Sequence, residues 1–298
     1  MADLLNMERQ KDAKLRWMPL HMQGMLANSV EDITRNIEHS LEQDYIPFNE
    51  LIGKKSGSVA VVGSGPSLKT NWHELRNFKG DILACNAACQ FLLDKGIVPK
   101  YMMCFDADPL VFEFFTPHPD ITYLLASRVP PKVFEILKDC RIVVWHAAGD
   151  EKIRDTLEKH KRMEPMIVGG SAAVTRAMML VLPIGYQEIH VYGGDSSFAN
   201  GETHIRKSTT DERRMAIKCG ERIFEIAPWM TMQVEDLKML APLIKKLNIK
   251  LHLHGDGLLQ YVGKELGFRT DYESAAQQLV RLFKRDLTHK ARILWQHV

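Results

Sequence analysis

Hydrophobic residues follow two different patterns along the chain, and the change comes near residue 56. Before it, apolar residues recur at helical spacing among Met, Gln, Arg and Glu, as at Ile33, Ile37 and Leu41. This spacing predicts a helical N-terminal arm over residues 1–50, with the helix ending before Pro47. We expect the arm to pack on the main domain or against another subunit, which makes it the candidate contact of a homo-oligomer.

Beyond residue 56 the apolar residues come in short continuous runs, with helix-like segments between many of them. Continuous rather than alternating runs indicate strands buried on both faces, and hence a mostly parallel sheet. Strands that alternate with helices predict an α/β, Rossmann-like doubly wound domain over residues 56–268. The expected strands are 59–62, 82–85, 101–105, 122–125, 141–145, 189–192, 222–226 and 250–254.

The last segment opens with Thr270-Asp271-Tyr272-Glu273, a Thr-x-x-Glu capping box that marks the start of a helix. Apolar residues then recur at helical spacing through about Leu287. We therefore expect a C-terminal helical tail over residues 270–298.

Composition is that of an ordinary soluble protein, with 45% hydrophobic and 26% charged residues among 298. The net charge of +2 is too small to indicate nucleic acid or an anionic membrane as a partner. No apolar run is long enough to predict a membrane span, and the N-terminus lacks the order of a signal peptide. Five cysteines, mostly in apolar runs and without zinc-site spacing, suit a reduced protein, so the expected location is the cytoplasm.

A glycine-rich turn follows the first expected strand, with the sequence Gly63-Ser64-Gly65-Pro66-Ser67-Leu68. Glycines permit a tight turn and let backbone N–H groups approach an anion closely. The turn matches neither GxGxxG nor a P-loop, and a plain strand-to-helix turn explains the same letters. The candidate nucleotide-binding residues in it are Gly63, Ser64, Gly65 and Ser67.

Polar side chains also follow the second and third expected strands. Asn86 comes directly after the second, where its amide could read a base or ribose or cap the next helix. Asp106 and Asp108 follow the third, spaced like a pair of ligands for Mg²⁺. Because Pro109 indicates that the strand is ending, Asp108 is as well explained by a turn, and Asp106 is the candidate magnesium ligand.

A second glycine-rich segment, Gly169-Gly170-Ser171, precedes a helix expected to run to about Leu182. Free N–H groups and the helix dipole make such a start an anion site, although a serine cap with glycines for close packing is the alternative. The candidate nucleotide contacts here are Gly170 and Ser171.

The segment after the strand 189–192 brings an acid and a histidine together within residues 193–204. Asp195 stands at the carboxyl end of its strand, where ligands bind in open α/β sheets, and His204 ends the loop. Histidine is the side chain best suited to acid–base work near neutral pH, so Asp195 and His204 are the candidate catalytic residues. Of the four cations beyond them, Arg206 or Lys207 could contact a donor phosphate, whereas Arg213-Arg214 is expected to be a solvated face.

His252 and His254 share one face of the last expected strand by its period of two. They could bind a metal ion, but no cysteine or further spaced histidine supports that function, and strand-end polar residues explain them better.

Taken in order, these motifs resemble the 6-hydroxymethylpterin diphosphokinase MptE-like family, which includes the motility-associated (Maf) flagellin glycosyltransferases. The motifs are Gly63–Leu68, Gly96-Ile97-x-Pro99 before Phe105-Asp106, Gly170-Ser171, and Gly194-Asp195-x-x-Phe198-x-x-Gly201-x-Thr203-His204. The resemblance covers roughly residues 57–205. A more distant similarity, in the glycine turn, Asn86 and the run before Asp195, is to small bacterial sialyltransferases that use CMP-sugars.

The resemblance implies a Rossmann-like domain that binds a nucleotide or nucleotide-sugar donor and transfers part of it to a small-molecule acceptor. By similarity to the sialyltransferases, Ser64, Gly65, Ser67 and Asn86 would hold the nucleotide, and Asp195 and His204 would fall on the late acidic motif. The Asp-Pro ending after the third strand and the GxDxxFxxGxTH motif favour glycosyl transfer. A Mg²⁺-dependent diphosphokinase that uses ATP is the runner-up, and a non-catalytic nucleotide-binding or structural protein is the third alternative.

Overall fold

The computed structural model describes residues 28–149, 152–162, 164–205 and 214–271. Residues 1–27 of the expected arm, 272–298 of the expected tail, and Arg206, Lys207 and Arg213 lie outside the described residues. The α-helices are α1 (Val30–Leu41), α2 (Leu68–Asn71), α3 (Ala88–Asp94), α4 (Pro131–Ile136), α5 (Ile153–Lys159), α6 (Ala173–Ile184), α7 (Met230–Lys246) and α8 (Leu258–Glu265). Short 3-10 helices are η1 (Phe48–Leu51), η2 (Trp72–Asn77) and η3 (Pro109–Phe114).

The strands are β1 (Ile46–Pro47), β2 (Ser58–Val62), β3 (Asp81–Cys85), β4 (Tyr101–Cys104), β5 (Thr122–Ala126), β6 (Arg141–Ala147), β7 (Met166–Ile167), β8 (Glu188–Tyr192), β9 (Met215–Cys219), β10 (Arg222–Ile226), β11 (Lys250–Leu253) and β12 (Arg269–Thr270). Ten of them form one sheet in the order β1-β6-β5-β4-β3-β2-β8-β11-β12, with β7 beside β6. Its ladders are parallel. Most residues of the central strands are fully buried, as the continuous apolar runs require. The predicted α/β, Rossmann-like doubly wound fold is confirmed.

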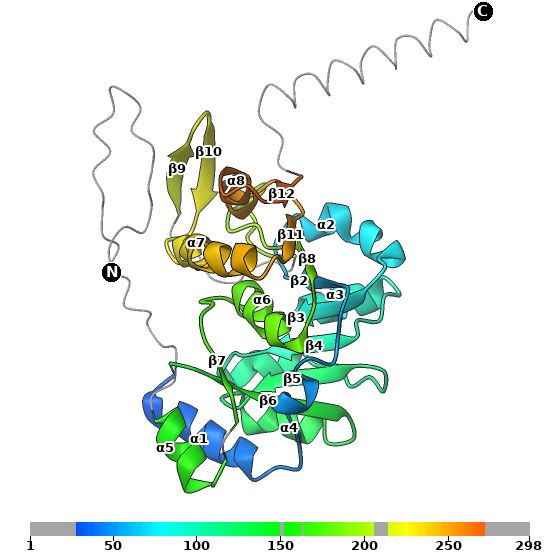
Figure 1. Cartoon of the computed structure of the whole chain (residues 1–298), viewed down its shortest axis with the longest axis vertical. Coiled ribbons are helices and arrows are strands. Elements are labelled where there is room, and N and C mark those ends of the chain that lie inside the picture. The colour runs from blue at the N-terminus through cyan, green and yellow to red at the C-terminus, as the bar shows by residue number, and fades with distance from the viewer. Residues whose placement is uncertain (1–27, 150–151, 163, 206–213, 272–298) are drawn as a thin grey trace, which may run out of the picture.

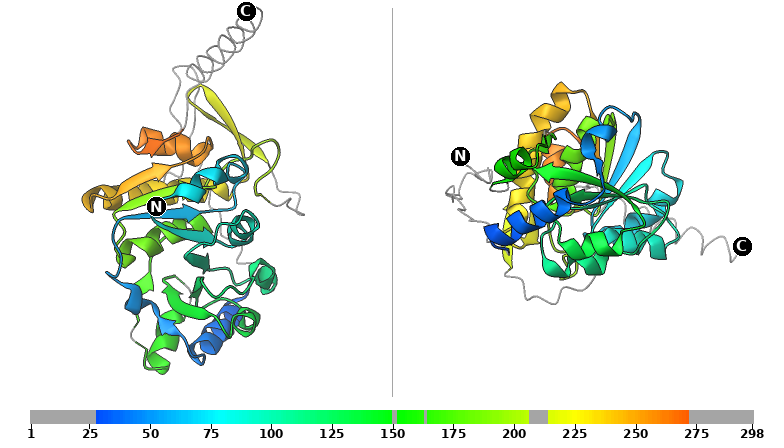
Figure 2. Two further views of the ribbon diagram at one scale, coloured as in Figure 1. Left: turned by 90° about the vertical axis from the view of Figure 1, so that its right-hand side faces the viewer. Right: turned by 90° about the horizontal axis from the view of Figure 1, so that it is seen from below.

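The order of the strands reverses direction once, between β2 and β8. From β2 the strands β3, β4, β5 and β6 follow one another in one direction across the sheet. The chain then crosses back, and β8 pairs with the edge of β2 that β3 does not occupy. Helices cover both faces of the sheet, with α2 and α3 on one side and α6 and α7 on the other (Figures 1 and 2). In open α/β sheets the crevice outside such a reversal is where ligands bind.

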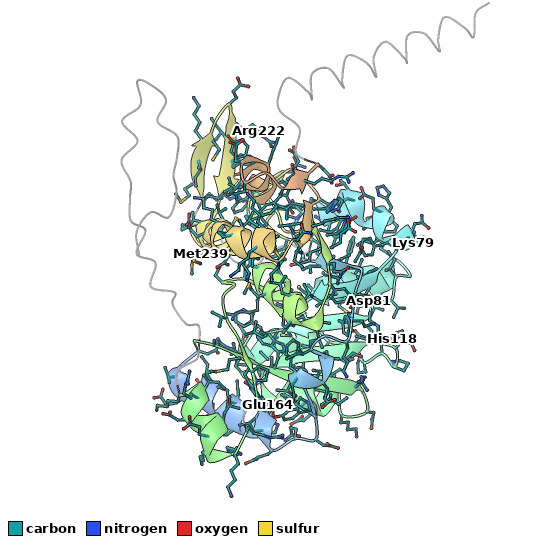
Figure 3. All side chains as sticks on the ribbon, in the orientation of Figure 1. Lys79, Asp81, His118, Glu164, Arg222 and Met239 are labelled. Carbon is teal, nitrogen blue, oxygen red and sulfur yellow. The ribbon has the colours of Figure 1, made fainter. Side chains whose placement is uncertain are left out.

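The predicted strand over 222–226 exists, but it does not belong to the parallel sheet. Residues Arg222–Ile226 form β10, which pairs antiparallel with β9 in a separate two-stranded hairpin. Gly220, at φ +56°, lies in the turn between the two strands. Each strand buries one side only, with Ile217 and Phe224 inward, and this alternation distinguishes it from the doubly buried runs. The hairpin carries Arg222 and lies at one end of the molecule, and Glu164 lies at the opposite end (Figure 3). Helix α1 is at the same end as Glu164 (Figure 1).

The described part of the N-terminal arm packs on the main domain. Helix α1 begins at Ser29, whose side chain accepts a hydrogen bond from the Asp32 N–H. Its predicted apolar face is buried in a small second core with α5 and Ala107. The role of the arm in an oligomer and the domain boundaries at 50, 56, 268 and 270 stay predictions. Across the described ranges, no helix combines the length and apolarity that crossing a bilayer requires.

Candidate active site

A cavity of about 210 Å³ lies at the reversal of strand order, where β2, β3 and β8 end. It brings together three of the predicted motifs, namely the glycine turn, Asn86 and the loop from Asp195 to His204. The starts of α6 and α7 close it from the other side. The lining residues are Gly63, Ser64, Gly65, Cys85, Asn86, Ala172, Ala173, Val174, Gly193, Gly194, Asp195, Ser196, Thr203, His204, Trp229, Met230 and Gln233.

The glycine turn after β2 interlocks with the loop after β8. The Gly63 and Gly65 amides donate to the carbonyl oxygens of Tyr192 and Gly193, at 2.8 Å each. A Cβ at Gly65 would stand 2.6 Å from Gly193 O, so the glycines are required for the close approach of two backbones. Because these amides are already used, Ser64 is the residue of the turn best placed to contact a ligand in the cavity.

Asp195 ties the two loops together. Its side-chain Oδ2 accepts a hydrogen bond of 3.0 Å from the Ser67 backbone N–H, and the residue is only 5% exposed. Burial raises the pKa of the carboxyl to about 6, against the lowering effect of the Ser67 hydrogen bonds. Ser67 thus contributes to the site through its amide and is not among the cavity-lining residues.

The raised pKa of Asp195 predicts a measurable dependence of stability on pH. The folded chain binds this proton more tightly than the unfolded chain, whose carboxyl has a pKa of 3.8. The stabilisation that protonation of Asp195 gives the folded chain is therefore fully present below pH 4 and is lost as the pH rises through 6. In total it amounts to about 3 kcal/mol in the free energy of unfolding. In urea unfolding, the free energy of unfolding of the wild type should rise relative to that of Asp195→Asn as the pH falls from 7.5 to 4. Parallel stability curves would contradict the burial of an ionisable carboxyl here.

Asn86 stands at the end of β3 with its backbone in the left-handed region, at φ +47°. Asparagine adopts that conformation more readily than most residues do. Its side-chain Oδ1 is buried and accepts no hydrogen bond within the described part of the chain. A buried acceptor without a partner costs about 1–3 kcal/mol, and a ligand that donates to it removes that cost. The residue lines the cavity, so Asn86 fits a ligand contact better than a helix cap.

His204 lies beside the glycine turn, and contacts of its neighbours fix its position there. The Ile205 N–H donates to the Ser64 carbonyl at 2.7 Å, and Thr203 Oγ1 lies 2.8 Å from His204 Nδ1. The imidazole is nearly parallel to the Trp229 indole, with ring centroids 6.3 Å apart. These contacts place a titratable ring beside the turn, in the position that the sequence predicted for chemistry.

The loop between Asp195 and His204 is anchored to β10 and α7. The Phe198 N–H donates to the Glu225 carbonyl of β10, and Ser196 Oγ donates to Gln233 Oε1 of α7 at 2.6 Å. Arg214 is exposed, as expected, and it also packs over the Phe198 ring and hydrogen-bonds to the Gly201 carbonyl, so it supports this loop.

The structure does not bring Gly170 and Ser171 to this cavity. Both the amide and the hydroxyl of Ser171 donate to Asp236 Oδ2 of α7 at 2.6 Å, and Thr175 Oγ1 donates to the same oxygen. The start of α6 therefore does hold an anion, but it is a carboxylate of the chain itself. Gly170 and Ser171 line a neighbouring cavity instead.

Asp106 also lies outside the cavity lining. It is exposed, and its Oδ1 accepts from the Asp108 N–H, while Asp108 Oδ1 accepts from the Leu110 N–H. The two carboxylates thus stabilise local turns. Among the described residues, the group of three side chains able to surround a metal ion lies elsewhere, at β8 and β11. The role of Asp106 as a magnesium ligand stays a prediction.

Sequence reasoning missed the contribution of α7. Trp229, Met230 and Gln233 line the cavity from a segment without a recognisable motif. Cys85 also lines it, but burial raises the pKa of its thiol far above the usual range, so it is no thiolate nucleophile. The buried polar residues Thr231 and Asp236 on an otherwise apolar helix face were the available signal.

Comparisons with known proteins bear on the family and the fold. The model of a family described as 6-hydroxymethylpterin diphosphokinase MptE-like matches residues 31–201. No curated protein sequence matches the chain. Among solved structures, the MAf glycosyltransferase from Magnetospirillum magneticum AMB-1 is similar at 15% identity and a TM-score of 0.60, over 84% of this chain and 39% of that one. The chain thus spans well under half the length of that protein, and the likeness establishes the fold alone.

Two sialyltransferases are more distant. A mammalian sialyltransferase in complex with Gal-beta-1-3GalNAc-ortho-nitrophenol has 13% identity and a TM-score of 0.40, over 76% of this chain and 79% of that one. The Campylobacter jejuni sialyltransferase CstII, in complex with the substrate analogue cytidine-5'-monophosphate, has 15% identity and a TM-score of 0.28, over 66% and 79%. These two likenesses are too distant to bear on the fold or function of this chain.

Proposed function

The chain belongs to the 6-hydroxymethylpterin diphosphokinase MptE-like family, and from that premise we propose that it is a nucleotide-dependent transferase with a nucleotide-sugar, CMP-sugar-like donor. The observation that carries the proposal is the cavity at the β2–β8 reversal, which gathers Ser64, Asn86 and His204. The buried Oδ1 of Asn86 supports a ligand that donates hydrogen bonds, as the base and ribose of a nucleotide do.

Each residue has a defined task in this proposal. Ser64 and Asn86 bind the nucleotide, and Asp195 holds the glycine turn in place through the Ser67 amide. During transfer the bond between the sugar's anomeric carbon and the donor phosphate oxygen breaks, and the acceptor hydroxyl oxygen bonds to that carbon. The proton of the acceptor hydroxyl passes to solvent. His204 donates a hydrogen bond to the departing phosphate, or gives it a proton that the imidazole then regains from solvent.

The runner-up is a diphosphokinase that uses ATP and Mg²⁺, and the description of the matching family favours it. Within the described lining of the cavity, Asp195 is the one carboxylate, and its Oδ2 already accepts from Ser67. Diphosphoryl transfer needs carboxylates or phosphates around the metal, so the donor set supports glycosyl transfer over this alternative.

A turnover assay separates these activities. The full chain is incubated with CMP-, UDP- and GDP-sugars, or with ATP and a hydroxymethyl pterin, each with Mg²⁺ or with a chelator. The proposal expects release of the nucleoside phosphate from one nucleotide-sugar, with water as the acceptor of the sugar, and activity that survives the chelator. AMP formation from ATP that the chelator abolishes would establish the diphosphokinase instead. Binding without any turnover would favour the non-catalytic alternative.

A further inference from the structure

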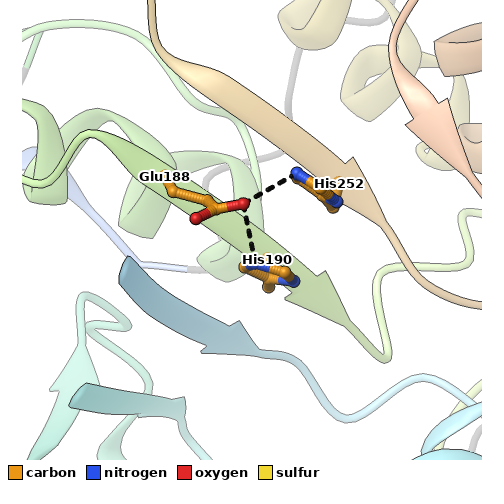
Figure 4. A group of neighbouring side chains, drawn as sticks. All are labelled: Glu188, His190 and His252. Atoms are coloured by element: carbon orange, nitrogen blue, oxygen red, sulfur yellow. Dashed lines mark ion pairs between the residues drawn. The ribbon is translucent and has the colours of Figure 1, made fainter. Parts of the chain in front are cut away.

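Three side chains that can bind a metal ion meet on two neighbouring strands, away from the cavity. Glu188 and His190 lie on β8, and His252 lies on β11 directly opposite His190 in the parallel register. Glu188 Oε1 is 3.5 Å from His190 Nε2 and 3.0 Å from His252 Nε2 (Figure 4). The three ligand atoms all lie within 4.8 Å of one another. Two imidazole nitrogens and a carboxylate oxygen therefore lie close together on the two strands.

The spacing of these atoms matches the requirements of a transition metal. Ligand atoms bound to a tetrahedral zinc ion at about 2.0–2.2 Å lie about 3.3–3.5 Å from one another. The rings of His190 and His252 are stacked, with centroids 4.4 Å apart and an interplanar angle of 19°, so one ring must turn before both Nε2 atoms can face the same ion. Two nitrogens with one oxygen suit Zn²⁺ or Co²⁺ and are not the all-oxygen set that Mg²⁺ and Ca²⁺ prefer.

A second layer of hydrogen bonds orients the same side chains. Ser58 Oγ donates to Glu188 Oε2 at 3.0 Å, which leaves Oε1 directed at the two imidazoles. His190 Nδ1 lies 3.0 Å from His254 Nε2, and His254 Nδ1 lies 2.9 Å from Asp271 Oδ2. Chains of this kind, from a metal-binding histidine to a carboxylate, fix the tautomer and direct the lone pair of Nε2 at the ion.

The hydrogen count along this chain calls for a cation. With neutral rings, Asp271 accepts from His254 Nδ1–H and His254 Nε2 accepts from His190 Nδ1–H. The lone pair of His190 Nε2 then faces the carboxylate oxygen of Glu188, which is also an acceptor. Either a metal ion lies between these two acceptors, or one histidine of the chain carries an extra proton.

We propose that Glu188, His190 and His252 form a binding site for one divalent transition-metal ion of the zinc type. The ion joins β8 to β11, the strands that precede the Asp195 and Gly255 loops, and so stabilises the half of the sheet beyond the strand reversal. The fourth coordination position is open to water, because the Glu188 side chain is 29% exposed. The site is independent of the proposed transferase activity, which neither supplies nor requires this ion.

Metal titration of the full-length chain tests the site. The purified protein is stripped with a chelator and titrated with Co²⁺, followed by its visible absorption, and then with Zn²⁺ in competition. We expect one equivalent to bind and to raise the melting temperature. His252→Gln should weaken binding at least about 100-fold, and His254→Gln, which acts through His190, about 10–100-fold.

Two further variants keep the result interpretable. Glu188→Gln preserves the shape of the side chain and is also expected to lose the metal. It replaces His252→Gln as the test if circular dichroism shows that His252→Gln does not fold. His73→Gln changes an exposed histidine of η2 and should bind as the wild type does. Absence of tight binding in the wild type, or equal affinity in wild type, His252→Gln and Glu188→Gln, would overturn the proposal.

Discussion

Replacing His204 with alanine is expected to reduce turnover by about 10²–10⁴-fold, the contribution typical of a positioned acid or base. The imidazole lines the cavity beside the glycine turn and is held there by Thr203 and Ile205. Its loss removes the group that stabilises the departing phosphate but leaves Ser64 and Asn86 in place. Steady-state kinetics should therefore show the loss in kcat, with nucleotide affinity changed only a few-fold.

The matched control for this variant is His73→Ala, which removes an exposed histidine from η2. It should keep wild-type turnover. Full activity in His204→Ala would refute a chemical role for His204, and an equal loss in both variants would point to a general effect of removing a histidine.

Gly65→Ala is expected to disrupt the site by forcing two loops apart. The added Cβ would lie 2.6 Å from the Gly193 carbonyl oxygen and still closer to the carboxylate of Asp195. Neither the backbone nor the buried carboxylate has room to move, so we expect a loss of about 2–3 kcal/mol in the free energy of unfolding. Because the turn carries Ser64, nucleotide affinity should fall at least tenfold as well.

Gly267→Ala provides the comparison for Gly65→Ala. Gly267 has φ +81° and open space around its Cβ position, so its replacement carries only backbone strain, about 1–2 kcal/mol. Nucleotide affinity should be unchanged. Urea unfolding and calorimetric binding measure both effects, and a Gly65→Ala protein that binds like the wild type would contradict the interlocked loops.

Seven of the ten strands of the sheet were predicted, because each is a short run rich in apolar residues. The other three, β1, β7 and β12, are two residues long and only partly buried, so they leave no such run. The strand at 222–226 reads differently, since only alternate positions such as Phe224 are buried. This alternation is typical of a hairpin with one solvated face, whereas the strand was expected beside the doubly buried ones. Local composition thus identifies a strand more readily than it identifies the strand's partner.

The candidate site was partly predictable for the same reason. Parallel strands end at one edge of the sheet, so Asn86, Asp195 and the glycine turn had to meet there once the strands were known. The partners that decide their roles come from elsewhere in the chain. Asp236, 65 residues beyond Ser171, occupies the helix start that was expected to bind phosphate. A polar residue such as Asp236 among apolar positions can be seen in a single sequence, but the distant helix start that it contacts cannot.

The histidine pair on the last strand illustrates a second limit. His252 and His254 were visible as residues of one strand face, but Glu188 and His190 join them only through the register of β11 against β8. Register depends on how two distant segments pack, and the apolar runs alone do not fix it. The proposed metal site therefore depends on the fold and could not be recognised from spacing along the chain.

Calorimetric titration with CMP, UDP, GDP and ATP, with and without Mg²⁺, tests most directly whether the cavity binds a nucleotide. The informative variant is Asn86→Gly, because glycine removes the side-chain amide and readily adopts the φ of +47° found there. Its control is Asn248→Gly, at an asparagine with φ +54° on an exposed turn after α7. We expect one nucleotide to bind at one site per chain, at least tenfold more weakly in Asn86→Gly and unchanged in Asn248→Gly. Failure of the wild type to bind any of these nucleotides, or equal affinity in all three proteins, would contradict a nucleotide site at the β2–β8 reversal.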